Sequence, residues 1–429
     1  MRVKRVTLTN FRNYHASTAD LCAGRNILIG ENAQGKTNFL EAIELAATGK
    51  SLRAQSDLDL IRSGADFMRL EIVIEARGAE ETLGIAFRIA GADARRAVEK
   101  QISINGLTHS MIKVLRGRLV AVSFKSQDLY LLRGGPKYRR EWIDTIAETL
   151  RPAFRDMTGK YQKVVTQRNK LLKSFFEKGR VSVTDQDQLK VWDQQLAKFG
   201  AGIIHQRMTL LAELLPKAER FQEHISGQRE NLTAEYIFSG TQSDDGDAYD
   251  EFGEPAREPS QPVQLELPGA KKGVIDETTI AKNLMQALRE RRAEEIARKQ
   301  TLVGPHRDDI KFCLNDASAV DFASQGQQRS LVLSLKLAEL ERVSESLTEP
   351  PVLLLDDVLA ELDLNRQGLL MSLVGDNMQT LITTTHVDGF KPEWLEGAQF
   401  LQVENGGIKE SAGSAAPVHA PAGISVPPG

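Results

Sequence analysis

A short apolar run at residues 26–29 stops at a glycine and leads into Gly-Glu-Asn-Ala-Gln-Gly-Lys-Thr at residues 30–37. Apolar residues then recur at helical spacing from Phe39 to Ala47. A buried strand that ends in a glycine-rich turn and opens a helix presents backbone N–H groups and the positive end of the helix dipole to an anion. The sequence therefore predicts a phosphate-binding loop at residues 30–37.

The pattern G-x-x-x-x-G-K-[ST] gives this loop a specific chemistry. Lys36 is predicted to reach the β- and γ-phosphates of ATP and to act in catalysis, and the Thr37 hydroxyl to ligate Mg²⁺. The alternative is a turn with a purely structural role, which the strand before it and the helix after it disfavour. The predicted phosphate-binding residues are Gly30, Glu31, Asn32, Ala33, Gln34, Gly35, Lys36 and Thr37.

A second apolar run, Val-Leu-Leu-Leu at residues 352–355, is followed at once by Asp356 and Asp357. Ligands of open α/β sheets bind outside the carboxyl ends of the strands. Asp356 is therefore predicted to hold Mg²⁺ through its water shell, and Asp357 to polarise the attacking water as a general base. The alternative is a buried strand that ends in a solvated acidic turn. More than three hundred residues separate Lys36 from Asp356, so a large insert is predicted between the two halves of the site.

The chain is organised as two sheet-containing segments that flank a helical excursion. Strands of a mixed sheet are predicted near residues 3–8, 70–76, 83–89, 101–104 and 119–122, and helices at 137–178, 186–225 and 276–299. Strand and helix alternation returns from Leu302 to Val403. An acidic, proline-containing insertion at 240–273 and the Ala/Pro/Gly/Ser-rich tail at 411–429 are predicted to be disordered.

Composition limits the class of protein. The 429 residues are 41% hydrophobic and 26% charged, which is ordinary for a globular protein. The apolar runs are too short to cross a bilayer, and the polar start of the chain carries no secretory signal. Cys22 and Cys313 lie far apart and outside any CxxC pattern, which argues against a disulfide framework or a cysteine zinc site. We expect a cytoplasmic protein without a membrane partner.

A Ser-x-Gly-x-Gln segment at residues 324–328 precedes leucines at helical spacing. On its own such a segment is more often a simple helix N-cap. It resembles the signature of ABC-type ATPases, in which the serine and the helix end contact the γ-phosphate of nucleotide held by the other subunit. A helix N-terminus is a suitable anion site. The residues carried over from this resemblance are Ser324, Gly326 and Gln328.

Several further segments match, in order, the RecF family of bacterial recombination-repair ATPases. The longer ones are residues 8–14 (LTNFRNY), 302–309 (LVGPHRDD) and 353–363 (LLLDDVLAELD). The shorter ones are Asp128-Leu129, Gly135-Pro136, Arg139-Arg140, residues 167–172 (QRNKLL) and Trp192-Asp193. The resemblance spans residues 1–405 apart from the acidic insertion.

The resemblance implies an α/β fold, with a P-loop ABC-type ATPase head of mixed sheet and flanking helices and an inserted, mainly helical lobe. The head would comprise residues 1–125 and 301–410, and the lobe residues 126–300. It implies an ATP-dependent head-to-tail homodimer on DNA at gaps or at single-strand/double-strand junctions. It also implies cooperation with RecO and RecR proteins in loading recombinase, with slow ATP hydrolysis resetting the switch.

Residue by residue, the resemblance places Arg12 and Asn13 near the base or ribose and Asp363 in a loop facing the partner. Gln127 stands where the family pattern has an acid; it is either a residue that touches Mg²⁺ and water or a surface amide. His386 follows a strand-like run and is a candidate γ-phosphate sensor, although the family does not lead us to expect a histidine there. Asp357 is one methylene shorter than the glutamate of related ATPases, which predicts slow hydrolysis.

Local charge predicts where DNA binds. Residues 125–180 hold fourteen Lys and Arg against six Asp and Glu, and few aromatic residues are interleaved, so contact with a duplex backbone is favoured over base stacking. The alternative is a solvated helix face. The acidic insertion either repels DNA or docks on this basic region. The candidate DNA-binding residues are Lys137, Arg139, Arg140, Lys160, Lys163, Arg168, Lys170 and Lys173.

Rival functions fit the sequence less well. A chromosome-structure protein would need long heptad arms, and a transport ATPase would lack the large helical insert. His306-Arg307-Asp308 resembles a kinase triplet, but Cys313 stands where that motif requires Asn. A nuclease-coupled ATPase ranks last because no metal-ligand cluster is visible.

Overall fold

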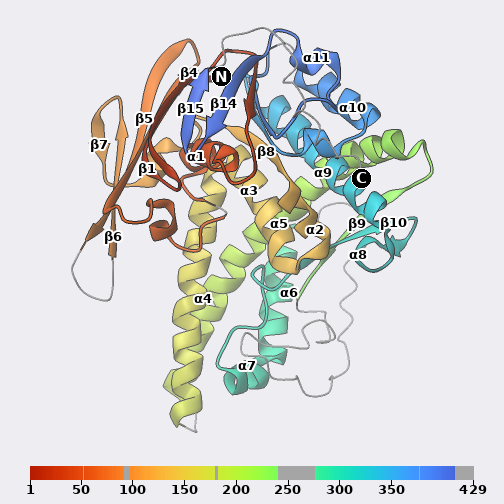
Figure 1. Ribbon diagram of the computed structural model, residues 1–429. Coiled ribbons are helices and arrows are strands. Elements are labelled where there is room, and N and C mark those ends of the chain that lie inside the picture. The colour runs from red at the N-terminus through yellow and green to blue at the C-terminus, as the bar shows by residue number, and fades with distance from the viewer. Residues whose placement is uncertain (52, 91–96, 179–181, 240–275, 376, 411–429) are drawn as a thin grey trace, which may run out of the picture. The chain divides into compact units, whose positions relative to one another are not determined.

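The computed structural model describes residues 1–51, 53–90, 97–178, 182–239, 276–375 and 377–410 (Figure 1). The chain divides into two compact units, Met1–Lys125 with Glu349–Gly429, and Ser126–Thr348. Residues 301–348, which the sequence assigned to the head, belong to the second unit in this division. The predicted acidic insertion and tail lie outside the described residues.

One sheet of the first unit is antiparallel, with strand order β2-β1-β4-β5-β6-β7 (Figure 1). Its strands alternate buried and exposed residues, as in β4, where Met68, Leu70, Ile72 and Ile74 are buried. Such alternation is typical of a sheet with one face on the core. The strands are β1 (Arg2–Phe11), β2 (Tyr14–Asp20), β4 (Phe67–Ala76), β5 (Ala79–Ala90), β6 (Ala97–Ile104) and β7 (Leu107–His109).

The other sheet of this unit has the order β15-β14-β3-β13-β12-β8 and is parallel except for the edge strand β15. The predicted strands near residues 3–8, 70–76, 83–89 and 101–104 lie in the antiparallel sheet, and the strand predicted near 119–122 corresponds to β8 in this second sheet, so the expected strands divide between two sheets. The strands are β3 (Arg25–Ile29), β8 (Ala121–Lys125), β12 (Val352–Asp356), β13 (Thr380–Thr384), β14 (Gln399–Glu404) and β15 (Gly407–Glu410).

Helix α1 (Lys36–Thr48) follows β3 and is almost entirely buried on its apolar side, with Phe39, Leu40 and Ile43 in the core shared with the antiparallel sheet. It ends at Gly49, whose positive φ forms the left-handed C-cap. The remaining helices of this unit are α10 (Leu364–Val374) and α11 (Pro392–Leu395), with short 3₁₀ turns η1 (Asp57–Leu60), η2 (Ile112–Leu115) and η4 (Leu359–Glu361).

The second unit is mainly helical. The predicted helix over residues 137–178 is interrupted at Arg151, because the following Pro152 disfavours helical backbone at the residue before it. Helices α4 and α5 pack against each other (Figure 1). The helices are α2 (Tyr130–Arg133), α3 (Pro136–Leu150), α4 (Pro152–Lys178), α5 (Val183–Ser226), α6 (Glu277–Glu290), α7 (Arg292–Arg298), α8 (Ala319–Phe322) and α9 (Gln325–Ser346), with the 3₁₀ turn η3 (Ser126–Leu129).

A three-stranded sheet of order β11-β10-β9 completes this unit. Its strand β9 (Leu232–Ile237) was not predicted, and it pairs antiparallel with β10 (Asp309–Leu314), which pairs in turn with β11 (Ala317–Ser318). The pairing joins residues more than seventy positions apart, which no local pattern reports. Among the described residues, none of the helices combines the length and apolar character needed to span a bilayer.

Candidate nucleotide-binding site

The phosphate loop, residues 30–37, lies at the carboxyl edge of the parallel sheet. The register pairs Ile29 of β3 with Thr384 of β13, and Thr383 of β13 with Asp356 of β12. The Gly30 N–H donates to the Thr384 carbonyl at 3.3 Å. Three adjacent strands therefore end together, and each supplies a polar group to one edge, which is where α/β sheets bind ligands.

Two glycines of the loop are required by close approach. A Cβ atom on Gly30 would lie 2.3 Å from the carbonyl oxygen of Val403 in β14. Gly35 has a φ of 120°, and a Cβ there would lie 2.8 Å from Asn13 Nδ2. The sequence pattern therefore corresponds to a steric need in this fold.

Lys36 is buried at the start of α1. Its ammonium donates to the carbonyl oxygens of Gly30 at 2.8 Å and Glu31 at 3.0 Å. The ammonium therefore lies against the first residues of its own loop, where the β- and γ-phosphates of a bound nucleotide are expected.

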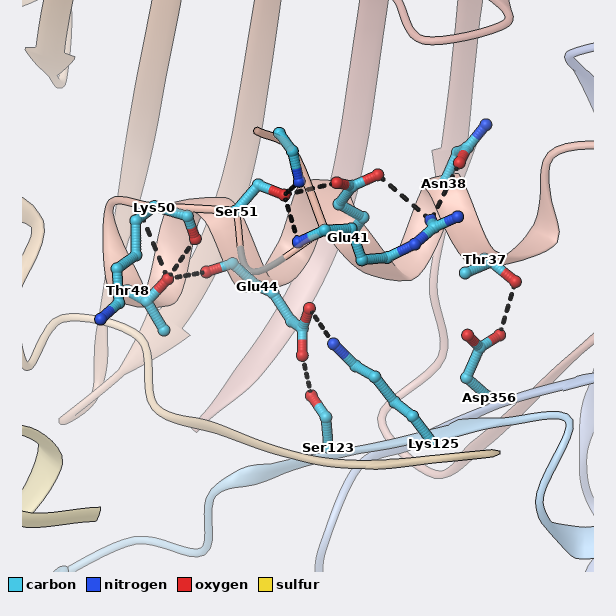
Figure 2. A network of polar contacts seen from close by, with 12 residues as sticks. Thr37, Asn38, Glu41, Glu44, Thr48, Lys50, Ser51, Ser123, Lys125 and Asp356 are labelled. Atoms are coloured by element: carbon cyan, nitrogen blue, oxygen red, sulfur yellow. Dashed lines mark hydrogen bonds and ion pairs between the residues drawn. The ribbon is translucent and has the colours of Figure 1, made fainter. Parts of the chain in front are cut away.

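Thr37 and Asp356 meet side chain to side chain, as predicted for a metal-binding pair. The Thr37 hydroxyl donates to Asp356 Oδ1 at 2.8 Å (Figure 2). The hydroxyl of Thr383, a residue that the sequence did not single out, donates to the same oxygen at 2.8 Å. Hydroxyl and carboxylate oxygens are the hard ligands that Mg²⁺ takes alongside water and substrate phosphates, so the residues present fit this ion.

Asp357 adopts left-handed backbone with a φ of 56°, and its N–H donates to Thr383 Oγ1 at 2.9 Å. Burial raises the pKa of its carboxyl group, Lys36 opposes this rise, and the neighbouring Asp356 adds to it. Strained backbone and a raised carboxyl pKa are both features of functional sites. The geometry suits the general base that the sequence predicts.

Residues from the hairpin of β1 and β2 donate hydrogen bonds to carbonyl groups of the phosphate loop. Asn13 Nδ2 donates to the Gln34 carbonyl at 2.8 Å, and Tyr14 donates to the Gly35 carbonyl at 2.9 Å. Burial raises the pKa of Tyr14, so this phenol stays a donor. Tyr14 was not predicted as a site residue, although it ends the LTNFRNY segment that carried the family resemblance.

Arg12 is directed at helix α1. Its Nε and Nη2 donate to the buried carboxylate of Glu41 at 2.9 and 2.6 Å, and its Nη1 donates to the Asp59 carbonyl at 2.8 Å. Ser51 and Arg53 hold the same carboxylate at 2.5 and 3.3 Å. Arg12 therefore fixes α1 behind the loop, and its contact with base or ribose stays a prediction.

A second carboxylate of α1 binds the end of β8. Glu44 accepts hydrogen bonds from Ser123 and from Lys125, the latter at 2.5 Å (Figure 2). Two residues after Lys125, Gln127 is exposed in η3, which belongs to the second unit. His386 is exposed just after β13, and its Nδ1 lies 2.8 Å from Thr385 Oγ1. A role for either side chain on nucleotide stays a prediction.

The signature segment, residues 324–329, opens helix α9 with a capping box. Ser324 Oγ accepts from the Gln327 N–H at 3.3 Å, and the Gln327 side-chain oxygen accepts from the Ser324 N–H at 2.8 Å. Ser324 and Gly326 are exposed. Gln328 accepts a hydrogen bond from Arg133 at 2.9 Å. Asp363 caps α10 by accepting from two backbone N–H groups at 3.0 Å.

Two of the eight candidate DNA-binding residues must be corrected. Arg139 is buried and ion-paired with Asp309 at 2.7 Å. Arg168 is fully buried and pairs with Asp193 at 2.9 Å and Glu295 at 2.5 Å. Both guanidinium groups are neutralised inside the fold, so neither is presented to DNA.

The other six candidates differ in exposure. Arg140 is half-buried and donates to the Asp308 carbonyl at 2.7 Å, and burial lowers the pKa of its guanidinium. The exposed side chains are Lys137 on α3, and Lys160, Lys163, Lys170 and Lys173 on α4. Lys163 and Lys170 are seven positions apart and therefore share one face of the helix.

Comparison with known proteins supports the same assignment. Residues 2–402 match the family described as the RecF/RecN/SMC N terminal domain. The DNA replication and repair protein RecF of Thermosynechococcus vestitus is 40% identical over 97% of this chain and 99% of its own. The corresponding protein of Crocosphaera subtropica is 38% identical over 96% of this chain and all of its own.

A solved structure of the recombination mediator protein RecF with ATP, in the RecFOR pathway, is 29% identical with a TM-score of 0.79. It covers 96% of this chain and 97% of that one. The predicted α/β ATPase head with an inserted helical lobe is confirmed by this likeness. The chain belongs to the RecF family of DNA replication and repair proteins.

Proposed function

We propose that this protein is an ATP-switched, DNA-binding dimer that acts in recombinational repair and replication restart. The observation that carries the proposal is the assembly at one sheet edge of Lys36, the Thr37–Asp356 pair and Asp357. The RecF relatives support it, because two solved RecF structures are those of RecF-ATP and RecF-ATPrS.

ATP would be held first by the loop backbone, the N-terminus of α1 and the ammonium of Lys36. Thr37 would supply an oxygen ligand to Mg²⁺ bound with ATP and Asp356 would hold the ion through water, and the ion would supply positive charge against the phosphates. Asp357 would accept a proton from the attacking water. Because its carboxylate is short, we propose that hydrolysis is slow and serves as a timer.

The exposed helix start at Ser324 supports a dimer closed by nucleotide. The Ser324 oxygen already accepts from Gln327, so its own hydrogen is available to donate to a phosphate oxygen. Two apolar side chains beside it, Val320 and Phe322, are 42% and 76% exposed. Large exposed apolar groups next to a polar site favour a protein interface. We propose that this surface meets the phosphate loop of a second copy.

DNA would lie along α4. Charge is offered to a duplex backbone by the exposed Lys160, Lys163, Lys170 and Lys173, whereas Arg168 of the same helix and Arg139 of α3 are buried. Binding of this kind weakens steeply with salt. Association with RecO- and RecR-type proteins at gaps or junctions, and help in loading recombinase, rest on the pathway of the RecF relatives. A role as an ATPase subunit of another assembly, for transport or chromosome structure, is the second candidate.

Gel filtration with and without ATP tests the proposal, using the wild type and Lys36→Met. The wild type with ATP should elute as a dimer and the other three samples as monomers. The same size in all four samples would contradict a nucleotide-gated dimer. DNA-stimulated ATPase activity would favour repair, and co-purification with membrane would favour the second candidate.

A further inference from the structure

We infer that Glu230 is a positioning residue for the signature serine, acting through the side-chain amide of Gln327. This rests on the proposed function of Ser324. Glu230 lies in the connection between α5 and β9, more than ninety positions from Ser324 in sequence. Neither the ATPase motifs nor the family resemblance pointed to it.

The amide of Gln327 is held at both ends. Its oxygen accepts from the Ser324 N–H at 2.8 Å, and its nitrogen donates to Glu230 Oε1 at 2.9 Å. An ionised carboxylate only accepts hydrogen bonds. Glu230 therefore forces the nitrogen of the amide toward itself and the oxygen toward Ser324, which is the only orientation that closes the capping box.

Glu230 is itself fixed by helix α5. Its Oε2 accepts from Gln222 Nε2 at 2.5 Å, and its own N–H donates to Ser226 Oγ at 3.3 Å. Gln222 is fully buried, and its oxygen accepts from Ser334 of α9 at 2.8 Å. These hydrogen bonds run from Gln327 of α9 through Glu230 and Gln222 back to Ser334 of α9. They therefore connect the first turn of α9 to helix α5.

The contact between Glu230 and Gln327 affects how the Ser324 hydroxyl group is held. With the capping box closed, Ser324 Oγ accepts from the Gln327 N–H, and its hydroxyl hydrogen remains available to donate. Without Glu230 the amide of Gln327 is held only at its oxygen, by the Ser324 N–H, so the side chain that closes the capping box is less firmly fixed. The start of α9 is then less rigidly held, and Ser324 becomes a less preorganised donor for a phosphate oxygen.

A double-mutant cycle separates this role from a general structural one. The variants are Ser324→Ala, Glu230→Ala, the two together, and Glu235→Ala as a control, since Glu235 is an exposed glutamate on the nearby strand β9. Sedimentation gives the ATP-dependent dimer dissociation constant. ATP affinity is measured at low protein concentration, where the chain is monomeric, and tests whether the phosphate loop is intact. The urea midpoint measures the stability of the fold.

Glu230→Ala should weaken the ATP-dependent dimer about tenfold, the value of one hydrogen bond to a charged group. The ATP affinity of the monomer should stay unchanged, as in the control, whereas the urea midpoint should fall modestly, because the buried amide of Gln222 loses its acceptor. In the Ser324→Ala background, Glu230→Ala should have no further effect. If Glu230→Ala does not fold, Glu230→Gln is used, because an amide offers one acceptor oxygen to the two donors of Gln327 and Gln222 and should weaken the dimer likewise.

A dimer of Glu230→Ala as tight as the wild type would overturn the inference, and so would additive losses in the double variant. Either result, with Ser324→Ala still impaired, leaves the proposed function intact. Normal ATP-dependent dimerisation of Ser324→Ala would instead overturn the proposed function itself.

Discussion

The hydroxyl of Thr37 lies 2.8 Å from Oδ1 of Asp356, a carboxylate 319 positions away in the sequence. The two residues end neighbouring segments of one fold, the phosphate loop and strand β12, and the whole second unit is inserted between them. A contact between these two side chains forms only when both flanks of the insert fold together. The energetics of the site therefore depend on long-range strand pairing as much as on the loop itself.

Loss of the Thr37 hydroxyl should weaken ATP binding only when Mg²⁺ is present. Thr37→Val keeps the shape of the side chain and removes an oxygen next to Asp356. We expect a loss of about ten- to one-hundredfold in ATP affinity with Mg²⁺, the range for one bond to a charged group. In EDTA the variant should match the wild type. Thr18→Val, on an exposed position of β2, is the control, and equal losses in both buffers would argue against a metal ligand.

The rate of ATP hydrolysis should depend on the ionisation of Asp357. Burial raises its pKa above the ordinary value of 3.8, and only the ionised carboxylate accepts a proton. The rate should therefore fall as pH drops through the raised pKa and level off above it, with turnover at the plateau below about 10 s⁻¹, the median for enzymes. Asp357→Asn should abolish hydrolysis yet keep ATP binding. A pH–rate profile whose acidic midpoint lies at or below 3.8 would contradict the assignment.

Arg168 should be needed for stability. Its guanidinium is fully buried with Asp193 and Glu295, and truncation leaves the buried Glu295 without its cation and Asp193 with Arg292 alone. Arg168→Ala should lower the free energy of unfolding by about 3–5 kcal/mol, as for other broken buried pairs. Lys170→Ala, two positions along the same helix and exposed, should change it little. Urea denaturation followed by circular dichroism measures both, and equal effects would contradict the burial of Arg168.

The exposed lysines of α4 should act on DNA affinity and not on stability. Replacing Lys163 and Lys170 together should weaken duplex binding and reduce the slope of log affinity against log salt by about 0.9 for each DNA phosphate that is no longer neutralised. Exposed Lys198 of α5 serves as the control position. Fluorescence anisotropy over a salt series gives the slope, and an unchanged slope would remove α4 from the DNA surface.

The phosphate loop and its neighbours were predictable because their signals are local. The run before Gly30, the Gly-Lys-Thr sequence and the apolar spacing of α1 lie close together in the chain, and Asp356 follows directly on its own strand. Thr383 and Tyr14 were missed, because a hydroxyl in a strand or hairpin has no pattern of its own until the partner that accepts its hydrogen bond is known.

The DNA-binding assignment was partly wrong for a related reason. The sequence gives the number of charged residues but not which of them are buried. The partners of Arg168 are Asp193 of helix α5 and Glu295 of helix α7, both distant from it in the chain. The division into two sheets and the strand β9 were likewise beyond prediction, because strand pairing joins residues distant in sequence. Which charges are buried and which strands pair depends on contacts between residues far apart in the chain, and composition does not report those contacts.

The central claim is that nucleotide held by one copy is closed by Ser324 of another. Mixing two inactive variants with ATP tests it: Lys36→Met removes the phosphate-binding ammonium, and Ser324→Arg blocks the signature. Each alone should stay monomeric, whereas differently labelled copies of the two should form mixed dimers, since the loop of one and the signature of the other make one intact site. Dimers of Ser324→Arg alone, or a mixture that stays monomeric while the wild type dimerises, would contradict the account.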